Sequence, residues 1–153
     1  MVYVRTFEEL VEMHGREIFA YALRLTGDRD EADDLFQETF LAAFRAFARA
    51  RDANLRAWLY RIATNKAADA RRRAARGVRI EDLELVAPER DGVTNADLAA
   101  AVRSLPPHER AAFVLRRVQD LPYSDVASVL DCSEEAARKR VSEATKKVKE
   151  ALA

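Results

Sequence analysis

Apolar side chains recur at helical spacing along most of this 153-residue chain, and one long stretch interrupts the pattern. In residues 7–26 they follow the i, i+3, i+4 spacing of an amphipathic helix, and the spacing returns at 30–48 and 55–75. Only four glycines and four prolines are present, so few residues oppose helix formation. The sequence therefore predicts an all-α fold.

Several predicted helices carry recognisable end signals. Thr6 and Glu9 have the spacing of a capping box, and Gly27 is a residue type that commonly ends a helix. Asn54 can cap the third helix. Four acidic residues crowd the first turn of the second helix, where the helix dipole favours anions. These signals place three helices in the first half of the chain.

The helical pattern is lost in GVRIEDLELVAPERDGVTN, which begins at residue 77. Two glycines, a proline and five acidic residues make this stretch typical of a linker. We therefore predict two small helical domains joined by an acidic linker. Their bounds are 1–76 for the first domain, 77–95 for the linker and 96–153 for the second domain.

The second domain ends in a helix-turn-helix pattern. A short helix is predicted at 123–130, a three-residue turn follows, and a long helix begins at residue 134. In such units the second helix enters the major groove of DNA, although an ordinary amphipathic surface helix is the structural alternative. The polar residues expected to face outward are Arg138, Lys139, Ser142 and Glu143.

The net charge is zero, but the charges are arranged in blocks. Residues 1–44 carry −6, 45–79 carry +9, 80–135 carry −7 and 136–153 carry +4. A single charged run is often only a solvated face. Two basic blocks separated by an acidic one indicate two anion-binding surfaces on one chain.

The first basic block is concentrated on the third predicted helix. Residues 54–76 hold seven cations, one anion and the aromatic residues Trp58 and Tyr60. Unpaired bases stack on aromatic rings while their backbone attracts cations, so the pattern favours single-stranded nucleic acid. The structural alternatives are that Trp58 packs in the hydrophobic core and that the terminal arginines complement the helix dipole.

The sequence gives little support to other classes of protein. The carboxylates of DRDEADD share a helix face, but no second acidic motif exists to complete a metal site, and helix initiation explains them. One cysteine and two histidines supply neither a disulfide nor a zinc site. No apolar run reaches the roughly 18 residues of a membrane span. We expect no enzyme activity, no cofactor, no metal, no membrane insertion and a cytoplasmic location.

Two segments resemble a known family. DEADDLFQETFLAAFRAF with AWLYRIATNKAADARRR resembles region 2 of bacterial extracytoplasmic-function (ECF) sigma factors, and LPPHERAAFVLRRVQDLPYSDVASVLDCSEEAARKRVSEATKKV resembles their region 4. The resemblance implies that the chain directs promoter-specific transcription initiation. Its implied partners are core RNA polymerase, through the β′ clamp helices and β flap, promoter DNA and an anti-sigma factor.

The resemblance also implies roles for residues of region 2. The surface that docks on the polymerase would include Asp34, Leu35, Gln37, Glu38 and Phe40. A loop ending at Asn54 would capture a flipped base of the −10 element, and Asn65 would read its upstream edge. The residues implied to contact the −10 element are Arg49, Arg51, Asn54, Trp58, Arg61, Asn65, Lys66, Arg71, Arg72 and Arg73.

In region 4, the resemblance places Arg138, Lys139 and Arg140 at the −35 element, with Ser142 and Glu143 beside them. The family often continues this helix with an Arg-Ala-Arg step, whereas this chain has Glu143, Ala144 and Thr145. The missing cations should weaken the grip on phosphate, and Glu143 could instead accept a hydrogen bond from cytosine.

The linker limits how the domains reach a promoter. About 20 flexible residues span roughly 25 Å as a coil, whereas elements two helical turns apart lie about 70 Å apart along DNA. The free chain should therefore be compact or mobile until polymerase spreads its domains. Two rival hypotheses remain: a stand-alone helix-turn-helix regulator, and a metal-dependent enzyme that uses the DRDEADD carboxylates.

Overall fold

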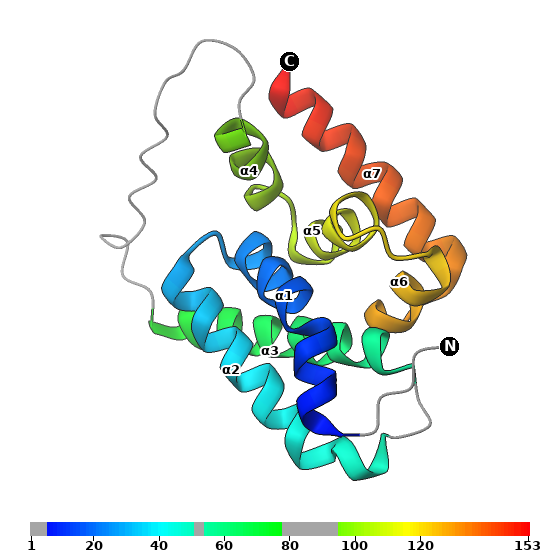
Figure 1. Ribbon diagram of the computed structural model, residues 1–153. Coiled ribbons are helices and arrows are strands. Elements are labelled where there is room, and N and C mark those ends of the chain that lie inside the picture. The colour runs from blue at the N-terminus through cyan, green and yellow to red at the C-terminus, as the bar shows by residue number, and fades with distance from the viewer. Residues whose placement is uncertain (1–5, 51–53, 78–94) are drawn as a thin grey trace.

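The computed structural model describes residues 6–50, 54–77 and 95–153, and throughout these residues the regular structure is helical (Figure 1). The predicted all-α class is confirmed. Most of the predicted acidic linker, and Arg51, lie outside the described residues. In chain order the elements are α1 (Phe7–Thr26), α2 (Arg29–Ala46), η1 (Phe47–Arg49), α3 (Leu55–Gly77), α4 (Asn95–Arg103), α5 (Pro107–Phe113), η3 (Val114–Val118), α6 (Tyr123–Leu130) and α7 (Glu134–Leu152).

The end signals read from the sequence at Thr6, Gly27 and Asn54 act at the ends of α1 and α3. The Thr6 hydroxyl accepts a hydrogen bond from the Glu9 amide, and Gly27 takes the left-handed conformation that ends α1. Asp28 caps α2. The Asn54 side chain accepts from the Ala57 amide and so caps α3.

The helices α1, α2 and α3 enclose the hydrophobic core of the first half. The rings of Tyr21 and Tyr60 meet edge to face with their centroids 5.0 Å apart, and both residues are fully buried. The Tyr21 hydroxyl finds a partner in the Thr64 hydroxyl at 2.7 Å, so its burial leaves no unsatisfied polar atom. The face of α3 opposite this core is left for other contacts.

The second half contains a local departure from α-helical geometry. The α-helix that begins at Pro107 ends at Phe113, and the chain continues as the π-helical turn η3. The Gln119 amide bonds the carbonyl of Val114, five residues earlier. Asp120 then takes a left-handed conformation, with φ of 58°. The widened turn reverses the chain ahead of α6.

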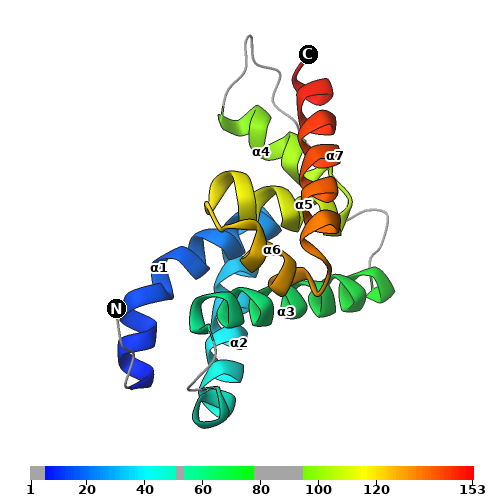
Figure 2. The same cartoon turned by 90° about the vertical axis from the view of Figure 1, so that its right-hand side faces the viewer.

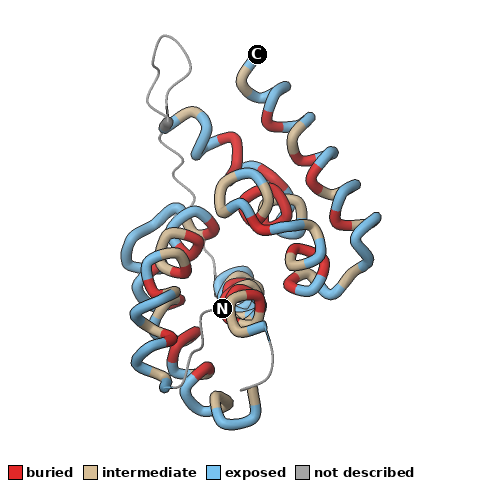
Figure 3. Tube along the Cα trace, turned by 45° about the vertical axis from the view of Figure 1, so that its right-hand side comes forward, coloured by how far each residue is buried: buried red, intermediate tan, exposed pale blue. Residues whose placement is uncertain are grey.

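The helix-turn-helix is present as predicted. Helix α6 ends at Asp131, which is left-handed with φ of 53°, and the Ser133 hydroxyl caps α7 through the Ala136 amide. The buried face of α7, which includes Ala137, is turned toward α4, α5 and α6, while its other face is exposed (Figure 3). That exposed face carries the cations singled out in the sequence.

The two halves pack against each other. Figure 2 shows α6 lying on α3, and α1 also contacts both α4 and η3. One hydrophobic cluster of buried side chains runs through both halves. Within the part of the chain that the structure describes, no helix combines the length and apolarity needed to cross a membrane.

Candidate nucleic-acid interface

The polar face of α3 opens onto a cleft between the two halves. Arg61 and Asn65 are exposed and line this cleft of about 350 Å³. Its opposite wall comes from the start of α5 and from the helix-turn-helix, including Leu130, Asp131 and Arg140. A polar amide and several guanidinium groups therefore share one solvent-filled space.

Two other candidates on α3 have structural partners. Trp58 is half-buried and packs against the hydrophobic core, which favours the structural alternative for its ring. Asn54 caps α3 with its amide oxygen and donates its amide nitrogen to the Asp125 carboxylate of α6 at 3.1 Å. Both side chains thus hold α3 in its place.

The cations toward the C-terminal end of α3 are partly paired. Arg72 forms an ion pair with Asp69 one turn earlier, and Arg73 lies 3.7 Å from Glu38 of α2. Lys66 lines the same shallow pocket as Glu38 and Arg73. These pairs are exposed, so water and salt screen them and nucleic-acid phosphate can compete for the cations.

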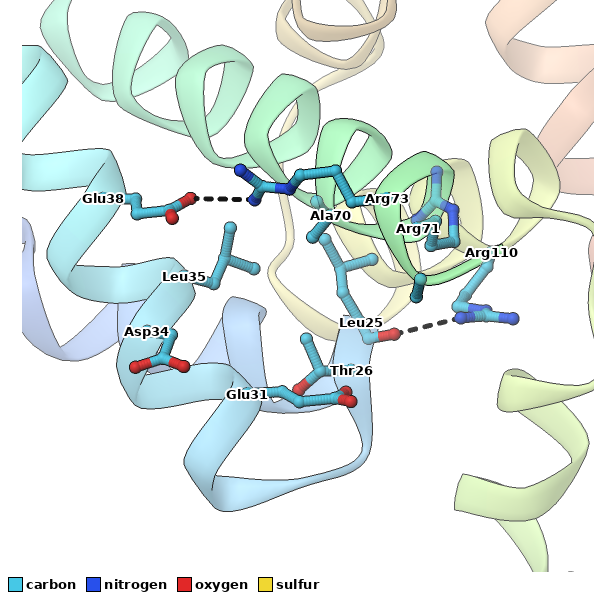
Figure 4. A pocket seen from close by; sticks show the side chains of 12 residues that line it. Leu25, Thr26, Glu31, Asp34, Leu35, Glu38, Ala70, Arg71, Arg73 and Arg110 are labelled. Carbon is cyan, nitrogen blue, oxygen red and sulfur yellow. Dashed lines mark hydrogen bonds and ion pairs between the residues drawn. The ribbon is translucent and has the colours of Figure 1, made fainter. Parts of the chain in front are cut away.

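Arg71 occupies a different setting. It is half-buried beside Arg110 in a pocket between α2, α3 and α5 (Figure 4). Burial lowers the pKa of Arg71, and the nearby charge of Arg72 lowers it further. In the preceding segment, Arg49 is exposed on η1.

The structure divides the α2 candidates into surface and core. Asp34 and Gln37 are exposed and Glu38 is half-buried, so these three can meet a partner. Leu35 and Phe40 are only 4% and 7% exposed. Both side chains pack in the hydrophobic core, on the side of α2 opposite its polar face.

Sequence reasoning missed two apolar residues on the outer surface of α2. Leu41 is 51% exposed and Phe44 is 62% exposed, with the Phe44 ring edge to face against Phe7. The signal was an apolar stripe on α2 broader than one buried face requires. Exposed side chains of this size commonly mark a protein-protein contact.

On the helix-turn-helix, Arg138 is held in a defined position. Its guanidinium lies 4.8 Å from the centre of the Tyr123 ring and 3.5 Å from the Glu134 carboxylate. Arg116 lies against the same ring at 4.4 Å. The residues that line the adjoining concave surface are Arg117, Tyr123, Arg138, Ser142, Thr145, Lys146 and Lys149.

The other α7 candidates lie on different faces. Lys139 and Glu143 are exposed one turn apart, and their opposite charges suit an i, i+4 pair of positions. Arg140 is half-buried and lines the cleft that it shares with Asn65. The structure therefore brings Arg138 and Ser142 together and separates both from Arg140.

A second polar cluster lies on the inner side of the first half. The Glu17 carboxylate accepts hydrogen bonds from the Tyr60 hydroxyl at 2.7 Å and from Arg56 at 2.8 Å, and it also bonds His14. Burial by itself would raise the pKa of Glu17, but these hydrogen bonds outweigh it and lower the pKa to about 2. Glu17 was not singled out from the sequence, because its partners Arg56 and Tyr60 lie 39 and 43 residues away along the chain.

Among the described residues, no group of three or more histidine, cysteine, aspartate or glutamate side chains is placed to hold an ion. Asp28, from the DRDEADD segment, serves as the helix cap of α2.

Comparison with known proteins matches both halves of the chain. Residues 10–77 match sigma-70 region 2, and residues 95–148 match sigma-70 region 4. The ECF RNA polymerase sigma factor SigE of Mycolicibacterium smegmatis is 34% identical over 97% of this chain and 62% of its own length. The RNA polymerase sigma-H factor of Pseudomonas aeruginosa is 32% identical over 97% of this chain and 86% of its own.

The chain belongs to the ECF sigma-factor family. Among solved structures, the sigma factor RpoE of Bartonella quintana, in complex with the anti-sigma factor NepR, aligns with a TM-score of 0.79 and 27% identity. That alignment covers 97% of this chain and 98% of the RpoE chain. The alignment spans both halves, so region 2 and region 4 are placed similarly relative to each other in the two chains.

Proposed function

We propose that this ECF sigma factor directs promoter-specific initiation by core RNA polymerase. Region 2 reads the −10 element as a single strand, and region 4 reads the −35 element as duplex. The observation that carries the proposal is the pair of cationic helices, α3 and α7, on the two matched sigma regions. We assign residues 1–76 to region 2, 77–95 to the linker and 96–153 to region 4.

For the −10 element, the proposal rests on the cleft-facing side of α3. Asn65 and Arg61 are exposed there, so an amide can read a base edge while a guanidinium holds the backbone. Lys66, Arg72 and Arg73 continue the positive charge along the helix. Trp58 acts from the hydrophobic core by fixing the position of α3 rather than by stacking on a base.

For the −35 element, Arg138 and Ser142 contact the duplex from the concave basic surface of α7. Lys146 and Lys149 add attraction to phosphate that does not depend on sequence. Lys139 and Glu143 face solvent on the same helix and are placed for further contacts. Arg140 reaches DNA only after the cleft between the halves opens.

The polymerase-docking surface lies on α2. Asp34, Gln37 and Glu38 supply negative charge, and Leu41 and Phe44 supply the apolar area that a protein interface needs. We assign this surface to the β′ clamp helices, and region 4 to the β flap. An anti-sigma factor is a further expected partner, because the similar RpoE structure contains NepR.

This assignment involves no covalent chemistry by the chain, no cofactor and a cytoplasmic site of action. A stand-alone helix-turn-helix regulator is the alternative. It would leave the cations of α3 and the exposed Leu41 and Phe44 without a role. The two hypotheses differ in whether core polymerase is required for promoter recognition.

The test is transcription from a promoter library by purified core polymerase, with and without the protein. We expect promoter-specific initiation only when it is added. Asn65→Ala should change the −10 preference, and Arg138→Ala should weaken dependence on the −35 element by about 1–3 kcal/mol, or about 5- to 150-fold. Unchanged promoter choice by both variants would contradict the residue assignment, and tight promoter binding without polymerase would favour the alternative.

A further inference from the structure

Three arginines line the cleft between the halves without a partner. Arg61 and Arg71 reach it from α3, and Arg140 reaches it from α7. None of the three forms a hydrogen bond or an ion pair with another of the described residues. The carboxylate among the lining residues belongs to Asp131. The cleft therefore holds an excess of positive charge that the protein itself does not neutralise.

The α3 wall of the cleft has a cation at each end and an amide between them. Arg61, Asn65 and Arg71 all lie on the cleft side of this helix. At about 1.5 Å per residue, the backbones of Arg61 and Arg71 are about 15 Å apart along α3. Asn65 is exposed between them, whereas the neighbouring Thr64 hydroxyl is already bonded to two tyrosines of the core. The Asn65 amide is therefore available to a ligand.

Arg71 carries an uncompensated charge in a partly buried position. Burial lowers its pKa, and the charge of Arg72 lowers it further. Arg110 lies beside it, but Arg110 directs its donors at backbone carbonyls, including that of Leu25 (Figure 4). A cation that is partly removed from water and has no counter-ion costs free energy. A bound anion would offset this cost at Arg71.

The rest of the cleft is suited to an organic group. Its apolar lining comes from both halves and consists of Leu25, Ala68, Pro107, Ala111, Val129 and Leu130. A nucleobase can lie against such side chains while Asn65 pairs with its edge, because an amide offers a donor and an acceptor that match adenine. The volume of about 350 Å³ is within the range of small-molecule sites. Cations at both ends and a mixed centre favour a nucleotide over a simple inorganic anion.

We infer that the cleft binds a nucleotide with phosphate on both sides of its sugar, that is, a nucleoside 3′,5′-bisphosphate. Arg61 holds one phosphate, Arg71 holds the other, and Asn65 reads the base. Arg140 adds its charge from the opposite wall. The ligand undergoes no chemical change. A nucleoside with a single phosphate engages only one end of the cleft and binds more weakly.

The first experiment measures ligand binding to the full-length free protein by isothermal titration calorimetry. The probes are adenosine 3′,5′-bisphosphate, adenosine 5′-monophosphate and inorganic phosphate, all at one salt concentration. We expect the bisphosphate to bind at least about tenfold more tightly than either of the others, because a hydrogen bond to a charged group contributes about that factor. A bisphosphate that binds no more tightly than inorganic phosphate or the monophosphate would overturn the inference.

Substitutions on α3 locate the ligand. Arg61→Gln and Arg71→Gln should each weaken bisphosphate binding at least about tenfold, and Asn65→Ala should weaken it at least about fivefold. Arg76→Gln is the matched control, because Arg76 is exposed on the same helix and lies outside the cleft. It should bind like wild type. Unchanged binding by Arg61→Gln or Arg71→Gln would contradict the site.

A measurement on wild type keeps the inference testable even if a variant does not fold. The chain has two histidines, of which His108 lines the cleft and His14 is bonded to Glu17 outside it. In NMR spectra, added bisphosphate should move the ring signals of His108 and leave those of His14 in place. His108 signals that do not move at saturating bisphosphate would overturn the inference.

The outcomes separate this inference from the proposed function, although Arg61 and Asn65 are shared with the surface that we assign to the −10 element. Bisphosphate binding with the expected variant effects supports the nucleotide site even where the protein initiates at no promoter. Promoter-specific initiation by a protein that does not bind the bisphosphate would leave the proposed function standing and overturn the inference.

Discussion

Two guanidinium groups lie against the ring of Tyr123, and one of them belongs to Arg138, the leading −35 candidate. The ring restricts the conformations of a long, flexible side chain before DNA arrives. Glu134 contributes a weak, exposed ion pair to the same arginine. At the scale of single residues, the recognition that we propose for region 4 would thus depend on a neighbour that need not touch DNA.

Tyr123→Leu should weaken binding to a −35 duplex, because a leucine removes the π face that positions Arg138. An exposed cation–π contact is worth about 0.5–1 kcal/mol, so we expect a loss of about two- to fivefold. Tyr123→Phe keeps the ring and should bind like wild type. Equal binding by Tyr123→Leu and Tyr123→Phe, measured by fluorescence anisotropy, would show that the ring has no positioning role.

The Glu17 carboxylate should make stability depend on pH in the acid range. Its pKa falls from 4.5 to about 2 on folding, so its contribution is complete above about 4.5 and is lost as the pH falls toward 2. Glu17→Gln should therefore destabilise the protein by about 1–3 kcal/mol at pH 7. The difference from wild type should shrink in urea unfolding at pH 4 and pH 3. A difference that stays constant with pH would contradict the assignment.

At the scale of elements, the first half is built from helices whose ends are set by single residues. Gly27 ends α1 with φ of 70°, and a Cβ added there would lie 2.3 Å from Cδ of Arg103 in region 4. Gly15, inside α1, has ordinary space around the same added atom, with Val11 Cγ1 at 3.7 Å. A methyl group would therefore clash at Gly27, whereas Gly15 has room for one.

Gly27→Ala should destabilise the protein by about 1–2 kcal/mol, because a left-handed alanine is strained and its methyl group displaces Arg103. Gly15→Ala is the matched control. It should be neutral or stabilising by up to about 1 kcal/mol, since alanine is the better helix former. Thermal unfolding of both variants gives the comparison, and equal melting temperatures would refute the argument.

At the scale of the whole molecule, Arg110 ties several helix ends together. Besides the Leu25 carbonyl of α1, its guanidinium bonds the carbonyls of Arg103 and Leu105. Burial lowers the pKa of Arg110, and the charges of Arg71 and Arg103 lower it further. Hydrogen bonds to three backbone carbonyls offset this unfavourable gathering of cations.

Arg110→Met keeps the aliphatic stem and removes the donors, so it should destabilise the protein by about 2–3 kcal/mol. Because one of the lost bonds, to the Leu25 carbonyl, crosses between the halves, unfolding should also become less cooperative, with region 2 and region 4 melting separately in calorimetry. Arg16→Met, at an exposed position of α1, should change neither property. A single unshifted transition for Arg110→Met would contradict this role.

Local structure was largely predictable from the sequence because its signals are local. The caps at Thr6, Asn54 and Ser133 act within a few residues, and apolar spacing identified α1, α6 and α7. The site was less predictable. Leu35 and Phe40 match a surface motif by position, yet the packing of α2 places both in the hydrophobic core.

The sequence by itself determined the helices, the helix-turn-helix and the family. Short-range periodicity, caps and motifs each involve residues that are close together in the sequence, so they can be identified without the tertiary structure. Only the tertiary structure decided that α6 lies on α3, that Gln119 meets Glu17 and Tyr60, and that Arg140 faces Asn65 rather than Arg138. The physical reason is that these contacts join residues far apart in the sequence. Their energy depends on how two apolar surfaces and a few polar groups fit together in space, and neither half specifies that fit alone.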